Sequence, residues 1–179
     1  LPVEYTSQQE AVLWTIRFPR VLAAGLVGAA LGVSGAVMQG VFRNPLASPG
    51  LIGVSSGAAV GAAVVIVLGL GSLGIWTLPL GAFAGGLIVA MGIYQFARRG
   101  GRMEVTTLLL AGIAVNALMG ALLSFLTYIS TDAALRSITF WTMGSVSGST
   151  WRLIGASAPF ILVSLALLQA YGRTLNLIV

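Results

Sequence analysis

The stretch FRNPLASPGLIGVSSG, Phe42 to Gly57, separates two long apolar runs with two prolines four residues apart and a Gly-x-Ser-x-Gly pattern. Pro45 cannot continue the helix before it, because proline has no backbone N–H and its ring clashes with the preceding turn. Ser48 is a suitable N-cap for a new helix that has Pro49 at its first position. The stretch therefore predicts a tight turn between two antiparallel helices.

Apolar residues dominate the chain on both sides of this turn. Of its 179 residues, 58% are hydrophobic and only 7% are charged, against about 25% charged in soluble domains. A membrane-spanning helix needs about 20 mostly apolar residues, because each adds about 1.5 Å against a hydrocarbon core about 30 Å thick. Five segments meet this requirement, at residues 21–42, 51–70, 78–97, 105–129 and 153–171. We expect an all-α, polytopic integral membrane helix bundle, with residues 1–179 forming a single transmembrane domain.

The loops between these segments predict their orientation. Arg98, Arg99 and Arg102 form a short basic loop, which the positive-inside rule assigns to the cytoplasm. Alternation of the spans then places the 44–48 turn inside. The N-terminus and the 130–151 connection are expected outside.

The 130–151 connection contains a helical pattern of its own. Asp132 is a good N-cap, residues 133–143 continue as a helix and Gly144 suits the stop. Eleven residues reach only about 16 Å, which is too short to cross a bilayer. The sequence therefore predicts a short helix on the outer side.

Several classes of function are excluded by residues that the chain lacks. It has no Cys, no His and no Lys, so disulfides and Cys or His metal sites are ruled out. The nine basic residues are scattered arginines without a basic face, which argues against nucleic acid. Two Gly-Ser patterns, at residues 32–35 and 53–57, match serine-hydrolase motifs, but no His or Lys is present to take the serine proton and no carboxylate lies within a span. We expect no catalytic residue, no cofactor and no metal site.

Small and polar residues inside the spans are informative as well. Glycines at four-residue spacing predict close helix packing, at positions 28 and 32, then 53, 57 and 61, then 81 and 85. Polar side chains in a membrane are costly, and each of them either bonds to another helix or lines a polar path. The residues concerned are Gln39, Ser55, Ser56, Asn116 and Ser124. No span contains Asp or Glu, so energy for transport would have to come from a partner.

Four motifs occur in a fixed order along the chain. They are Arg-x-Pro-Arg at residues 17–20, Ser-Gly-Ala-x-x-Gln at 34–39, Arg-Asn-Pro-Leu-Ala at 43–47 and Phe-Trp-x-Met-Gly at 140–144. In these motifs the chain resembles, from Trp14 onward, the FecCD permeases. These are the membrane subunits of ABC importers for iron-siderophore, haem and vitamin B12. Members of that family have about ten spans per subunit, so the five spans here are expected to be a piece of something longer.

The resemblance implies a function and a set of partners. It implies a translocation subunit of a binding-protein-dependent importer for an iron chelate, haem or corrinoid, in a bacterial cell (inner) membrane. Expected partners are a second permease copy in a homodimer, cytoplasmic ATP-binding subunits, a periplasmic or lipid-anchored substrate-binding protein and the lipid bilayer. A truncated, non-transporting membrane scaffold or assembly piece is the alternative. A secondary transporter is disfavoured by the missing intramembrane carboxylate.

The resemblance also implies roles for particular residues. The span at 105–129 is similar to the family's fifth helix, which implies that it lines the translocation pathway. The implied pathway and gate residues are Ser56, Asn116, Ser124, Ser130 and Thr131. By the same resemblance, Arg17 and Arg20 dock the binding protein, and the alternative is that they only anchor the chain at the membrane interface.

Overall fold

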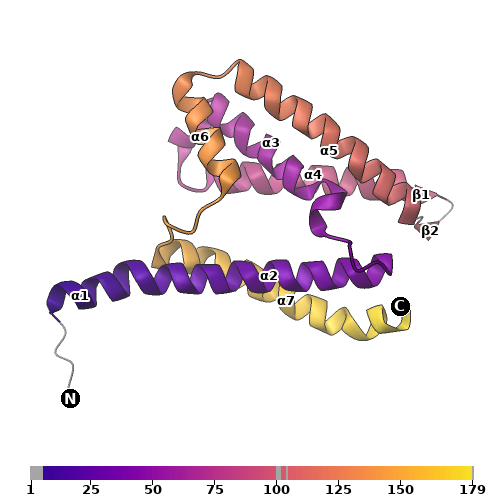
Figure 1. Ribbon diagram of the computed structural model, residues 1–179, viewed down its shortest axis with the longest axis horizontal. Helices are drawn as coiled ribbons and strands as arrows, with labels where there is room; N and C mark the ends of the chain where they lie inside the picture. Colours follow the sequence, from indigo (N-terminus) through magenta and orange to yellow (C-terminus); the bar gives the residue numbers. More distant parts are fainter. Residues whose placement is uncertain (1–5, 100–101, 104, 179) are drawn as a thin grey trace. The chain divides into compact units, whose positions relative to one another are not determined.

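The computed structural model describes residues 6–99, 102–103 and 105–178, and most of these residues are helical (Figure 1). The chain divides into two compact units. The first unit comprises residues 1–45 and 145–179, and the second comprises residues 46–144. The prediction of an all-α membrane bundle is confirmed, whereas the expectation of a single domain over 1–179 stays a prediction.

The first unit is built from two long helical segments that lie side by side (Figure 1). One runs without a break through α1 (Ser7–Val12), a π-helical turn (Leu13–Arg17) and α2 (Phe18–Phe42). The other is α7 (Trp151–Ile178). The predicted span at 21–42 is therefore the C-terminal part of a longer helix.

Two hydrogen bonds show that the segments of the first unit run parallel. The Trp151 indole Nε1 donates to the Trp14 carbonyl at 2.7 Å. The Arg20 Nε donates to the Ser147 carbonyl at 3.0 Å. Both bonds join the beginning of one segment to the beginning of the other, so α2 and α7 start at the same end.

In the described residues of the second unit, four helices, two 3₁₀ turns and two short strands surround an apolar core. In chain order these are a 3₁₀ turn (Pro49–Ile52), α3 (Val54–Val67), a 3₁₀ turn (Leu70–Leu73), α4 (Thr77–Ala97), β1 (Arg98–Arg99), β2 (Arg102–Met103), α5 (Val105–Tyr128) and α6 (Asp132–Met143). The strands form a two-residue antiparallel ladder that pairs Arg99 with Arg102. The core lies mainly between α3 and α4, where Ala62, Val65 and Ile93 are buried.

Glycines allow α3 and α4 to pack backbone against backbone. A Cβ added to Gly57 would lie 2.7 Å from the Gly85 carbonyl oxygen, a distance that real Cβ atoms do not show. Gly61 faces Gly81 in the same way, one turn further along. Close packing is thus confirmed for these patterns. By contrast, the described part of the chain places nothing within 4 Å of such an atom on Gly28 in the first unit.

The predicted span at 51–70 is shorter than expected as a regular helix. Its α-helical part, α3, has 14 residues and reaches about 21 Å. The helix begins late because Gly53 has a left-handed φ of +71°, which ends the preceding 3₁₀ turn. It ends early because Gly69, with φ +66°, is left-handed as well. Four helical segments of the described chain are long and apolar enough to cross a membrane by themselves.

Two predicted N-caps also differ from the structure. Ser48 occupies the N-cap position, but its side chain makes no capping bond and the element that follows is the 3₁₀ turn. The N-cap of α6 is Thr131, whose hydroxyl accepts from the Ala134 N–H, and Asp132 is the first helical residue. The predicted stop at Gly144 is confirmed, with φ +71°.

Candidate functional site

Ser56 and Asn116, two of the predicted pathway residues, meet between α3 and α5. The Ser56 hydroxyl lies 2.7 Å from Asn116 Oδ1 and 2.9 Å from the Gly53 carbonyl, and its proton can be donated to either. The Asn116 Nδ2 donates to the Gly50 carbonyl at 3.0 Å and lies 3.4 Å from the Leu51 carbonyl. The carboxamide of Asn116 therefore fastens the Pro49–Ile52 turn and the first turn of α3 to α5.

Local sequence places this turn against the middle of α5. Pro49 starts the turn, and its fixed φ suits the first helical position. Gly112 lets the α5 backbone come close to Leu51, because a Cβ at Gly112 would collide with the Leu51 carbonyl. Asn116 lies one helical turn beyond Gly112 and so meets the same segment. The interhelical hydrogen bond is thus present, and the role of the two side chains in a pathway stays a prediction.

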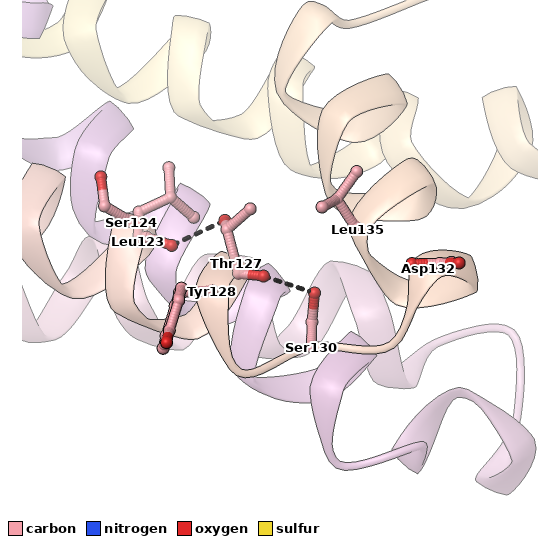
Figure 2. A pocket seen from close by; sticks show the side chains of 7 residues that line it. All are labelled: Leu123, Ser124, Thr127, Tyr128, Ser130, Asp132 and Leu135. Atoms are coloured by element: carbon pink, nitrogen blue, oxygen red, sulfur yellow. Dashed lines mark hydrogen bonds between the residues drawn. The ribbon is translucent and has the colours of Figure 1, made fainter.

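Ser124 and Ser130 line a pocket at the end of α5 (Figure 2). The pocket has a volume of about 600 Å³, and all seven of its lining residues come from α5, the start of α6 and the turn between them. They are Leu123, Ser124, Thr127, Tyr128, Ser130, Asp132 and Leu135. Thr131, the remaining predicted residue of this region, is the N-cap of α6 rather than a lining residue.

Two hydroxyl groups of this pocket donate their protons locally. Thr127 Oγ1 donates to the Leu123 carbonyl at 2.7 Å, and Ser130 Oγ donates to the Thr127 carbonyl at 2.8 Å (Figure 2). Each oxygen is left with lone pairs only, so it can accept but not donate a further bond. The carboxylate of Asp132 adds two oxygens that accept only.

Sequence reasoning did not assign Thr127, Tyr128 and Asp132 to this site. The helical period contained the signal for the first two, because positions 124, 127 and 128 share one face of a helix. Asp132 at the start of a helix indicates a cap and gives no signal for a pocket. Its place in the pocket depends on the tight turn after α5, where Ile129 and Ser130 still bond back to the helix.

Arg17 and Arg20 are both exposed on the helical segment that precedes and begins α2. The Nε of Arg20 is engaged by the Ser147 carbonyl, which leaves the two terminal nitrogens of its guanidinium for other partners. Arg17 ends the π-helical turn. Both side chains lie close in sequence to Trp14, whose ring packs on Phe18 at a centroid distance of 4.9 Å.

The π-helical turn is explained by Pro19 and Trp151. The Phe18 N–H bonds to the Leu13 carbonyl, five residues back. In this register the next donor, that of residue 19, would serve the Trp14 carbonyl, but proline has no N–H. The Trp151 indole supplies the missing donor. Pro19 is fully buried at this point, so the two long segments are fixed to each other where the helix register changes.

The described residues contain no group of three or more His, Cys, Asp or Glu side chains that could hold a metal ion. Their polar groups are instead hydroxyls, amides, arginines and isolated carboxylates such as that of Asp132. Such a set binds by hydrogen bonding and charge.

Comparison with known proteins relates the whole chain to one family. Residues 2–179 match the model of the FecCD transport family. A cobalamin import system permease protein of Halobacterium salinarum is 43% identical over 169 residues, which are 94% of this chain and 45% of that protein. A vitamin B12 import system permease protein of Escherichia coli is 48% identical over 148 residues, which are 83% of this chain and 45% of that protein.

A solved structure has the same fold. It shows an inward-facing conformation of a transporter assigned to the metal-chelate type of ABC transporters, with a TM-score of 0.88 and 35% sequence identity. The match covers 99% of this chain and 56% of that one. The chain thus spans less than half the length of the curated relatives it matches.

Proposed function

The chain belongs to the FecCD transport family, and we propose that it forms part of the translocation subunit of a binding-protein-dependent ABC importer. The cargo class is an iron chelate, haem or corrinoid. The family match over residues 2–179 carries this proposal. The matched relatives are permeases, which supports a transport role in the cell (inner) membrane rather than catalysis, with ATP hydrolysis supplied by a separate partner.

The parallel start of α2 and α7 supports five membrane crossings. Two parallel spans must be separated by an odd number of crossings, and α4 and α5 supply two of them. The segment around α3 is therefore the third. α3 provides about 21 Å, and the flanking 3₁₀ turns at Pro49–Ile52 and Leu70–Leu73 lengthen this segment toward a core thickness of about 30 Å.

The proposed partners follow from the kind of importer. The permease works with a second copy of itself, with two cytoplasmic ATP-binding subunits and with a periplasmic or lipid-anchored substrate-binding protein. The metal-chelate type and the cobalamin and vitamin B12 systems of the relatives support this assembly. The absence of Asp and Glu from the predicted spans fits a transporter whose energy comes from a partner.

We assign the translocation pathway to the side of α5 that carries Ser124 and to the pocket that follows it. The pocket presents hydroxyl groups and one carboxylate between apolar walls, and a mouth of this kind can admit a large chelate. Thr131 shapes this mouth by capping α6. The Ser56–Asn116 contact is a gate element, because it holds an irregular backbone segment, and such segments occur in membranes where they line a cavity.

Arg17 and Arg20 are the proposed docking residues for the binding protein. Both are exposed and lie at the end of the first unit that the orientation rule places outside. A guanidinium can grip a carboxylate with two parallel bonds. The bond from Arg20 to Ser147 fixes the direction of that side chain, which lowers the entropy cost of docking.

The proposal is tested with the complete permease assembled with its ATPase and binding protein. We expect ATP hydrolysis to rise when the binding protein is loaded with chelate. Cysteines placed at positions 124 and 130 should react with a water-soluble thiol reagent, because this pathway is aqueous. ATP hydrolysis at the same rate with and without loaded binding protein would contradict the importer. Cysteines at these positions that do not react would overturn the pathway assignment.

A further inference from the structure

Arg152 is an exposed arginine that has no part in the proposed function. It is the second residue of α7, and Thr150 caps that helix with a hydroxyl that accepts from the Leu153 N–H at 3.3 Å. The N-terminal turn of a helix carries a positive partial charge, which disfavours a cation there. The first turn of α7 contains no acidic residue that would offset this charge. Arg152 therefore lies where the backbone of its own helix disfavours it.

Two hydrogen bonds bring the start of α7 next to Arg17 and Arg20. Trp151, the residue before Arg152, donates its indole proton to the Trp14 carbonyl at 2.7 Å. The Arg20 Nε donates at 3.0 Å to a carbonyl of the loop that leads into α7. Arg17 lies on the helical segment between these two bonds. The three arginines therefore belong to one end of the first unit.

No carboxylate of the described residues neutralises this end of the first unit. None of the three arginines forms an ion pair with a residue that the structure describes. Arg17 and Arg20 are three residues apart, a spacing at which like charges on a helix repel each other. The orientation of the spans does not explain the arginines either, because the positive-inside rule places positive charge in the cytoplasm. An anionic group from outside the chain would relieve this repulsion.

We propose that Arg152 joins Arg17 and Arg20 in one docking surface, and that a carboxylate-bearing face of the substrate-binding protein occupies it. The inference rests on the proposed function, in which Arg17 and Arg20 dock that partner. Arg152 extends their patch from the α2 segment to α7, so carboxylates can be held from both helical segments at once. A guanidinium binds a carboxylate with two parallel hydrogen bonds, and opposite charges across an interface raise the rate of association.

Two features of this end of the unit favour a protein over lipid phosphate as the source of the negative charge. The helical segment continues outward from Arg17 to Ser7, which is about 15 Å, so the chain extends well beyond the arginines. The loop at residues 145–150 presents exposed hydroxyls, among them Ser145 and Ser147, whose oxygens lie 2.7 Å apart. Such hydroxyls can bond to a protein surface directly or through water.

The association rate of the binding protein with the complete permease tests this assignment. The permease is placed in nanodiscs of phosphatidylcholine alone and in a second set that also contains phosphatidylglycerol. In both sets Arg152→Glu should slow association about fivefold at low salt, the upper range for one exposed charge contact. The difference should shrink at about 0.5 M salt, because exposed charges are then screened. Arg152→Gln should slow association less, since it removes the attraction without adding repulsion.

Arg98→Glu is the matched control. Arg98 is exposed at the end of α4 and belongs to the loop that is predicted to be cytoplasmic, so the same change in net charge should leave the association rate unchanged. Melting temperatures separate docking from a structural role. Because the start of α7 disfavours a cation, Arg152→Glu and Arg152→Gln should melt at the native temperature or above it.

An unchanged association rate for both Arg152 variants would overturn the proposal. Slowing that occurs only in the phosphatidylglycerol nanodiscs would overturn it as well, because that result assigns the arginine to lipid phosphate. Slowing together with a lowered melting temperature in both variants would show a structural role instead of docking. Failure of the proposed function has a separate signature: the native permease would then not associate with the binding protein at all, and the docking role of Arg17 and Arg20 would be wrong too.

Discussion

Asn116→Leu removes the contact that joins α5 to the turn before α3, with a side chain of the same branched shape and no polar atom. Two short hydrogen bonds are lost, from Nδ2 to the Gly50 carbonyl at 3.0 Å and from Ser56 to Oδ1 at 2.7 Å. Interhelical hydrogen bonds in membrane proteins contribute about 0.6 kcal/mol on average and at most about 1.7 kcal/mol. We therefore expect the variant to lose about 1–2 kcal/mol of its free energy of unfolding.

The loss of unfolding free energy stays at this size because the remaining polar groups keep other hydrogen-bond partners. Ser56 can turn its proton fully to the Gly53 carbonyl, which is already 2.9 Å away. The Gly50 carbonyl still accepts from the Gly53 N–H. Because neither group is orphaned, the penalty for an unsatisfied buried group does not apply.

A double-mutant cycle measures the contact itself. The complete permease in bicelles is unfolded as the native protein, Ser56→Ala, Asn116→Leu and the double variant. We expect a coupling energy of about 0.6 kcal/mol between the two positions. Ser124→Ala, an exposed pocket residue, is the matched control and should change stability by less than about 0.5 kcal/mol. A coupling energy of zero would refute the claim that these side chains hold the turn to α5.

Three further predictions concern other contacts. Gly85→Ala should destabilise the complete permease by about 1–3 kcal/mol through overpacking against the Gly57 backbone, whereas Gly28→Ala, with open space around it, should be neutral or stabilising in thermal unfolding. Trp151→Phe should cost about 0.5–1.5 kcal/mol, because it keeps an aromatic ring but removes the hydrogen bond to the Trp14 carbonyl; equal melting temperatures for Trp151→Phe and the equally exposed control Trp76→Phe would argue against this role. Arg17→Glu with Arg20→Glu should slow docking of the binding protein and weaken its salt dependence, since rim charges act mostly on the association rate; unchanged rates at low and high salt would leave anchoring as their role.

The sequence predicted the elements that depend on apolar length and on proline. The helices at 78–97 and 105–129 agree with α4 and α5 within one residue at each end. Their bounds are set by a loss of apolar residues, which any hydropathy pattern records. The close approach of α3 and α4 was also predictable, because glycines at four-residue spacing have one dominant use in membrane helices.

Elements set by backbone register could not be predicted in the same way. The left-handed Gly53 shortens α3, but the sequence shows only that a glycine is present and does not determine its φ. The π-helical turn requires Trp151, 137 positions from the carbonyl it serves, and no local pattern reports such a partner. The predicted N-cap of α6 differs from the observed one by one residue, because Thr131 and Asp132 are both good caps.

The sequence predicted which residues belong to the candidate site from their polar side chains, but it did not predict which residues they contact. A polar side chain in an apolar span indicated Ser56 and Asn116, yet their contact joins residues 60 positions apart. In the pocket, the Thr127 and Ser130 hydroxyls can only accept a further hydrogen bond, because each already donates to a backbone carbonyl. That information exists only in the folded turn after α5.

ATP-dependent uptake by the reconstituted complex tests the central claim most directly. The complete permease is placed in proteoliposomes with its ATPase subunits, and a loaded binding protein is added on the side opposite the nucleotide. We expect accumulation of the chelate that requires ATP, the binding protein and two permease copies together. Accumulation that continues without nucleotide would show a secondary transporter, and a stable membrane protein that binds no ATPase would show a scaffold; either result would contradict the importer.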